Sequence, residues 1–180
     1  LLGQVAGGGA VLAWVDGRGL FRHDGSDWSM TEQPRAVLLE AMNERAQAVP
    51  FAVSPGSADG EAWLAAVGGL YRTRDAGLTW DQVAIPPTAG FNLLFTDVVV
   101  AEDVVVAVAP RPAGILPAEQ SDLLTASVFY SDDAGGTWED LTGDAPFRYP
   151  GGVTLDDEGR VLVAAMDGGL YRLDGDSWTL

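Results

Sequence analysis

The sequence predicts an all-β chain built from repeated, four-stranded antiparallel units. An eight-residue motif of the form Ser/Thr-x-Asp-x-Gly-x-Thr-Trp occurs at residues 73–80 and again at 131–138. Each copy follows a short apolar and aromatic run, as expected where a strand enters a turn. The 180 residues also include 23 glycines and 10 prolines, which favours many tight turns over helices.

Two shorter copies of the motif lie near the ends of the chain. They occupy residues 23–28 and 173–178 and keep an aspartate, a glycine and a tryptophan. The four tryptophans that close the copies are Trp28, Trp80, Trp138 and Trp178. Their spacings of 52, 58 and 40 residues are typical of propeller blades, so the predicted fold is a β-propeller with four visible units.

The first unit, at about residues 1–31, has the weakest strand pattern. A weak strand within 1–6 precedes clearer strands at 10–15 and 20–23. The one helical candidate follows at residues 35–45, where Pro34 stands at the start and apolar residues recur on one face. This helix would join the first unit to the second.

The second unit, at about residues 47–84, shows the whole meander. Its strands are predicted at 47–53, 61–67, 70–73 and 79–83. A polar turn, the pair Gly68-Gly69 and the Asp-Ala-Gly turn of the motif connect these strands in order. The unit is therefore an antiparallel meander.

The third and fourth units follow the same plan. The third, at about 91–142, has β-branched strands at 93–100 and 104–109, and a long excursion at 110–125 replaces its short hairpin. The fourth unit has strands at 152–155, 160–166, 170–173 and 177–180. It occupies about 151–180, and we expect a single domain over 1–180.

The charge of the chain excludes several classes of partner. The net charge is −16, and every basic side chain except that of His23 is an arginine. Such a field repels phosphate backbones and anionic lipids, so we expect no nucleic-acid binding. No apolar run is long enough to span a membrane, so no membrane insertion is expected. The absence of cysteine excludes disulfides and thiolate metal sites.

The repeated motif predicts a structural turn. Its aspartate can accept hydrogen bonds from N–H groups of its own turn, its glycine permits positive φ, its threonine can bond the turn again, and its tryptophan packs the turn onto its unit. A metal or acid–base role for the aspartates is the alternative. The residues assigned to this structural role are Asp24, Trp28, Asp75, Gly77, Thr79, Trp80, Asp133, Gly135, Thr137, Trp138, Asp174 and Trp178.

This motif resembles the Asp-box, or BNR repeat, of sialidase-like β-propellers, and the resemblance covers essentially the whole chain. The superfamily includes sialidases, xyloglucan-cleaving glycoside hydrolases, sortilin-type receptors and photosystem assembly factors. The resemblance implies that the motif is structural and lies on the face away from the usual ligand site. It also implies an extracytoplasmic location: secreted, periplasmic or at the cell surface. Those families have six, seven or ten blades, so four units either close alone, belong to a larger propeller or pair with another chain.

Meander topology puts the lengthened loops on the face opposite the motif, which the resemblance marks as the binding face. The excursion at 110–125 lies there, and its apolar side chains are the partner-binding candidates: Ile115, Leu116, Leu123 and Leu124. The expected occupant is a protein partner or a second copy of the chain. The alternative is that the excursion folds back over its own blade.

Three arginines recur after an aromatic residue: Arg22, Arg72 and Arg172. Sialidases clamp a substrate carboxylate with three arginines, but their Tyr-Glu pair and Arg-Ile-Pro-like segment have no counterpart here. We therefore expect each arginine to pair with a nearby aspartate. The acidic run at 132–144 is predicted to be a solvated rim, because it lacks the ligand spacing of a calcium loop.

The function expected from the sequence is a non-catalytic protein-interaction or scaffold module without catalytic residues, cofactor or metal. The alternative is a carbohydrate-binding or glycoside-hydrolase or sialidase-like propeller fragment. A glycan site needs surface aromatics on the loop face, and the candidates there are Phe91, Phe147 and Tyr149.

Overall fold

The computed structural model describes residues 2–7, 9–15, 18–31, 50–66, 68–85, 94–110, 128–166 and 168–180. This part of the chain is all-β, with four antiparallel sheets of four strands each, and contains no helix. The predicted fold class is therefore confirmed. The helix predicted at 35–45 lies outside the described residues, as do the partner-binding candidates Ile115, Leu116, Leu123 and Leu124.

Each sheet is a meander of consecutive strands, which we call a blade. Blade 1 consists of β1 (Leu2–Gln4), β2 (Val11–Val15), β3 (Gly19–His23) and β4 (Trp28–Met30). Blade 2 consists of β5 (Pro50–Pro55), β6 (Ala62–Ala66), β7 (Gly69–Thr73) and β8 (Asp81–Gln82).

The other two blades repeat this order. Blade 3 consists of β9 (Asp97–Ala101), β10 (Val104–Val108), β11 (Val128–Ser131) and β12 (Glu139–Asp140). Blade 4 consists of β13 (Pro150–Leu155), β14 (Val161–Ala165), β15 (Leu170–Asp174) and β16 (Ser177–Thr179). In each blade the second strand pairs with the first and the third, and the fourth strand is on the outer edge.

The outer strand of blade 2 is shorter than the sequence pattern predicts. A strand was expected at 79–83, but β8 comprises two residues, Asp81 and Gln82. Thr79 is bound instead to the carboxylate of Asp75, which keeps it in the preceding turn. The threonine and tryptophan of the motif therefore lie in the turn and not in the fourth strand.

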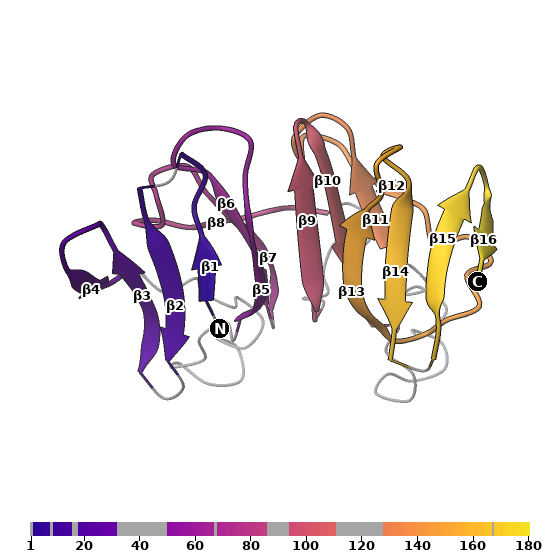
Figure 1. Ribbon diagram of the computed structural model, residues 1–180, viewed down its shortest axis with the longest axis horizontal. Coiled ribbons are helices and arrows are strands. Elements are labelled where there is room, and N and C mark those ends of the chain that lie inside the picture. The colour runs from indigo at the N-terminus through magenta and orange to yellow at the C-terminus, as the bar shows by residue number, and fades with distance from the viewer. Residues whose placement is uncertain are drawn as a thin grey trace.

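The blades stand side by side in chain order and form an open row (Figure 1). The first strands line up along the row, since β1 contacts β5, β5 contacts β9, and β9 contacts β13. Blades 1 and 4 lie at opposite ends of the row (Figure 1). Each end blade therefore has one face with no described blade against it.

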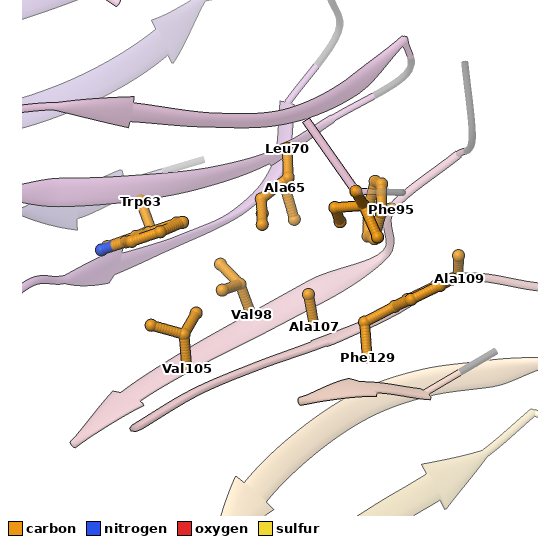
Figure 2. Packing of buried hydrophobic residues seen from close by; sticks show 10 residues of the cluster. Trp63, Ala65, Leu70, Phe95, Val98, Val105, Ala107, Ala109 and Phe129 are labelled. Carbon is orange, nitrogen blue, oxygen red and sulfur yellow. The ribbon is translucent and has the colours of Figure 1, made fainter. Parts of the chain in front are cut away.

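The hydrophobic core lies between blades. Between blades 2 and 3, the side chains of Trp63, Ala65 and Leu70 face those of blade 3, as Figure 2 shows. A second cluster joins blade 3 to blade 4 through the valines of β10, β13 and β14 and Phe147. Because both faces of an inner blade are buried, β6 and β10 are almost continuously apolar.

The turns between first and second strands share one face with the turns between third and fourth strands, as predicted from the meander. In blade 3, the N–H of Ala134 in the later turn donates to the carbonyl of Asp103 in the earlier one, at 2.8 Å. In blade 2, Ala76 donates to Gly60 in the same way. We call this side of the row the turn face.

Candidate interaction surfaces

The motif of blade 2, residues 73–80, forms a turn closed by its aspartate. One carboxylate oxygen of Asp75 accepts the N–H groups of Leu78 and Thr79, at 3.0 and 2.9 Å, and the hydroxyl of Thr73 at 2.8 Å. The other oxygen accepts the hydroxyl of Thr79 at 2.6 Å. Gly77, with φ of 85°, donates its N–H to the Thr73 hydroxyl. We call this arrangement the Asp turn.

The motif of blade 3, residues 131–138, forms a second Asp turn with matching contacts. Asp133 accepts the N–H of Thr137 at 2.7 Å and the Thr137 hydroxyl at 2.9 Å. The hydroxyl of Ser131 donates to Asp133 and accepts the N–H of Gly135. Ser131 thus takes the place that Thr73 has in blade 2.

The end blades have shorter turns with different bonding. Asp24 accepts the N–H groups of Ser26 and Asp27 within its own turn. Asp174 instead accepts three hydrogen bonds from the guanidinium of Arg172, at 2.8 to 3.0 Å, and one from the hydroxyl of Thr179. The two shorter copies of the motif therefore differ from each other.

These turn carboxylates are held in the ionised form. At Asp133 the N–H of Thr137, followed by the hydroxyls of Ser131 and Thr137, lowers the pKa below its usual range. At Asp75 burial works in the opposite direction, but the bonds from Thr79 and Thr73 still lower the pKa. The pKa of Asp174 is lowered, first by its bonds from Arg172. A carboxylate that serves as an acceptor in this way is a poor proton donor.

The Asp turns also hold neighbouring blades together through an arginine. The guanidinium of Arg22 in blade 1 donates to the carbonyl of Ala76 in blade 2 at 2.7 Å. Arg72 in blade 2 donates to the carbonyl of Ala134 in blade 3 at 2.8 Å. Ala76 and Ala134 both have positive φ, 61° and 53°. The expectation that each arginine pairs with a nearby aspartate holds for Arg172, whereas Arg22 and Arg72 make these contacts between blades.

The glycine of each Asp turn makes room for the residue opposite that arginine. Leu12 is paired with Arg22 across β2 and β3, and Trp63 is paired with Arg72 across β6 and β7. A Cβ on Gly77 would lie 2.6 Å from Leu12, and one on Gly135 would lie 2.4 Å from Trp63. The turn therefore receives an apolar side chain and an arginine from the preceding blade. We call this contact the socket.

Glu61 completes the socket between blades 2 and 3. Its carboxylate is buried, accepts the N–H groups of Ser57 and Ala58, and forms an ion pair with Arg72. Burial raises its pKa, but these N–H donors and the positive charge of Arg72 outweigh burial and hold the pKa below its usual range. The guanidinium carbon of Arg72 also lies 4.9 Å from the ring centre of Trp63, in a cation–π contact. No sequence pattern pointed to Glu61, because its counterparts in the other blades are not acidic.

The motif tryptophans pack between blades, not only onto their own unit as the sequence suggested. Trp80 packs against a cluster that includes Leu12 and Leu20 of blade 1. The rings of Trp138 and Trp63 meet edge to face, with centroids 6.3 Å apart. Trp178 donates its indole N–H to the carbonyls of Leu141 and Thr142, which follow blade 3.

Blades 3 and 4 are joined without a socket. Tyr130 occupies the place that Arg72 has in blade 2, and the space beside Gly175 is empty. The carboxylate of Asp97 instead accepts the N–H of Val153 in blade 4 at 2.9 Å, and the N–H of Val98. Burial raises the pKa of Asp97, and this effect outweighs the two hydrogen bonds, which lower it. Asp97 was missed in the sequence because nothing marks a strand-initial aspartate as a contact between blades.

The aromatic candidates for a glycan site are not brought together. Phe147 is buried against Tyr171 and Trp178, so its assignment to the surface was wrong. The reason is that the segment before β13 carries Phe147 into the core between blades 3 and 4. Tyr149 is 40% exposed, and Phe91 lies outside the described residues. Among the described residues no group of three or more acidic or histidine side chains could hold a metal ion.

No helix in the described part of the chain is long and apolar enough to cross a membrane. The chain matches no protein-family model and no curated protein sequence. Solved structures do match it, at low sequence identity.

The structure of YCF48 bound to D1 peptide aligns with a TM-score of 0.59 and 14% identity, over 98% of this chain and 50% of that one. The GH74 xyloglucanase from Xanthomonas campestris aligns with a TM-score of 0.62 and 16% identity, over 91% and 25%. The extracellular domain of BT3049 from B. thetaiotaomicron, described as a hybrid two-component system, aligns with a TM-score of 0.67 and 15% identity, over 99% and 24%. The chain thus spans half or less of each of these structures. At such identities the likeness shows the fold alone: this chain has the fold of an open segment of a β-propeller.

Proposed function

We propose that the chain is a non-catalytic protein-interaction module of the Asp-box propeller type. The Asp turns hold neighbouring blades together. The loop face, which is the face opposite the Asp turns, binds a protein or peptide partner. The partner-binding residues proposed there are Ile115, Leu116, Leu123 and Leu124.

The observation that carries this proposal is that the carboxylates described above accept hydrogen bonds that stabilise the fold. A glycoside hydrolase needs two convergent carboxyl groups, one of which keeps a proton and can deliver it. Among the described residues, the carboxyl group whose pKa is raised is that of Asp97, and both of its oxygens accept backbone N–H groups. Those of the turns have lowered pKa values and bind their own turn or an arginine. Their chemistry supports a structural role.

The structural neighbours support a protein partner and a location outside the cytoplasm. YCF48 has been solved with a bound peptide, and BT3049 contributes an extracellular domain. The net charge of −16 favours a basic or neutral partner surface over an acidic one. We propose an extracytoplasmic accessory or assembly role on this basis.

A second candidate function is glycan binding or cleavage. The observation in its favour is the likeness to the GH74 xyloglucanase, together with the exposed ring of Tyr149. Of the aromatic candidates in the described residues Tyr149 is exposed and Phe147 is not, which gives one stacking platform there, whereas polysaccharide sites need several convergent groups. We therefore place this function second.

The experiment compares the wild-type chain with a variant in which Gly-Gly replaces residues 112–122. Both are used to capture partners from the native source, with proteins quantified by mass spectrometry, and both are applied to a glycan panel. We expect selective protein capture that the variant loses, while circular dichroism and the thermal midpoint stay at wild-type values. Retention of every partner by the variant, or a selective glycan ligand removed by Tyr149→Ala, would overturn the proposal.

A further inference from the structure

The two outermost blade faces, one on blade 1 and one on blade 4, resemble the two sides of the socket contact that joins neighbouring blades. We call the face that a blade turns to the next blade its trailing face, and the opposite one its leading face. In blades 1 and 2 the trailing face carries an apolar residue paired across the strands with an arginine: Leu12 with Arg22, and Trp63 with Arg72. In both cases the pair enters the socket of the following blade.

Blade 4 carries the same pair on its trailing face, with no described blade to receive it. Leu162 lies opposite Arg172, and Ala164 lies opposite Leu170. Leu170 corresponds to the buried Leu20 and Leu70, yet it is 55% exposed. With no socket in reach, the guanidinium of Arg172 is turned onto its own neighbour Asp174.

Blade 1 carries the receiving half on its leading face. Ala13, Val15, Arg18, Phe21 and Trp28 line an apolar hollow of about 290 Å³ there. Trp28 is 52% exposed, although its counterparts Trp80 and Trp138 pack against a preceding blade. The space beside Gly25 is open, where Gly77 meets Leu12 and Gly135 meets Trp63.

We propose that the trailing face of blade 4 docks on the leading face of blade 1 of a second copy of this chain. Leu162 and Leu170 would cover the ring of Trp28, and Arg172 would exchange Asp174 for a main-chain carbonyl of the turn at 24–27. Arg160 and Arg172 at the edge of blade 4 are paired with carboxylates of their own blade, so the apolar faces and not charge carry this pairing. The buried apolar faces supply the attraction.

The contact joins a trailing face to a leading face, and each copy of the chain has one end face of each kind. Such a head-to-tail contact forms a ring when its rotation closes and a filament when it does not. We propose that two copies close, giving a ring of eight blades from the four that the described residues of each copy form. This surface is separate from the loop face, so the inference stands or falls independently of the proposed function.

The first test is the mass of the 180-residue chain in solution, measured by sedimentation over about 1–100 µM, a range that brackets dissociation constants typical of specific contacts. We expect a species of twice 18.9 kDa. Trp28→Asp should weaken association by at least about 30-fold, the loss typical of a central tryptophan in an interface. Leu78→Asp is the matched control, because Leu78 is equally exposed, at 52%, but lies on the turn face. It should leave the mass unchanged.

The second test does not depend on a disruptive variant. The chain has no cysteine, so Leu170→Cys and Val11→Cys each introduce one thiol, on the trailing and the leading end face. These positions correspond to Leu20 and Ala62, which pack together between blades 1 and 2. Under mild oxidation a cross-linked dimer should form when the two variants are mixed and not when either is alone. A monomeric wild-type chain, or cross-linking of either variant with itself at the yield of the mixture, would overturn the proposal.

Discussion

Arg72 donates a 2.8 Å hydrogen bond from blade 2 to the carbonyl of Ala134 in blade 3. The left-handed backbone of Ala134 turns this carbonyl towards the preceding blade. Arg22 and Ala76 repeat the arrangement one blade earlier, at 2.7 Å. The contact therefore belongs to the repeat, and it couples each Asp turn to the strand pair of its neighbour.

Arg72→Met should destabilise the chain by about 3 kcal/mol, because it leaves the buried carboxylate of Glu61 without its cation. The measurement is urea unfolding followed by tryptophan fluorescence. Arg172→Met is the control, since Arg172 is more exposed and binds Asp174 on an end blade. It should cost much less in the monomer. The double variant Arg72→Met with Glu61→Gln should recover part of the loss, and no recovery would show that the ion pair is not the cause.

Gly135→Ala should destabilise by about 3 kcal/mol, the sum of a left-handed backbone and an overpacked contact. The φ of Gly135 is 83°, and the new Cβ would lie 2.4 Å from the buried ring of Trp63. Gly159→Ala separates the two causes, because Gly159 has a similar φ of 77° and empty space around it. That control should lose about 1 kcal/mol, the cost of the left-handed backbone alone. Equal losses in thermal unfolding would mean that the contact with Trp63 contributes nothing.

Stability should fall in acid as Asp133 takes up a proton. Its pKa is lowered in the folded chain, first by the N–H of Thr137, so its contribution is present above the pKa of the unfolded chain and is lost as the pH falls through the folded-state pKa. We expect the thermal midpoint to drop below about pH 4, near the ordinary pKa of an aspartate. Asp133→Asn should show a flatter decline over this range.

Asp132→Asn is the control for that experiment. It removes the same charge one residue away, from a side chain that takes no part in the bonds of the Asp turn. We expect it to keep the wild-type acid profile. If both variants decline alike, general charge repulsion and not the turn governs the effect.

The fold could be predicted from the sequence because local signals repeat in each unit. Glycines, polar turns and β-branched runs mark the strands of a meander whatever surrounds it, and the spacing of Trp80 and Trp138 gives the size of a blade. Contacts between blades leave no such signal. The partner of Arg72 is a backbone carbonyl 62 residues away, and any residue type could supply it.

The mistaken placement of Phe147 has the same origin. The residues that flank Phe147 in the sequence are typical of a loop between blades, so the sequence predicts that its ring lies on the surface. Its environment is set by Tyr171 and Trp178, which come from the next blade. The sequence therefore indicates the turns and strands, but it carries no signal for the residues whose role depends on an adjacent blade.

Asp97 should respond to pH in the direction opposite to Asp133. Burial raises its folded-state pKa, so Asp97 binds a proton more readily in the folded chain than in the unfolded chain. Its contribution to stability is full below the unfolded pKa and is lost as the pH rises through the folded-state pKa.

Asp97→Asn removes the charge and keeps an oxygen that can accept the N–H of Val153. We expect this variant to unfold at pH 7 no earlier than the wild-type chain, and to lack the loss of stability that Asp97 causes between about pH 4 and neutrality. Thermal unfolding across this range measures both effects. A variant that is less stable than wild type at pH 7 by as much as at pH 4 would show that the hydrogen bonds of Asp97, and not its buried charge, determine its contribution between blades 3 and 4.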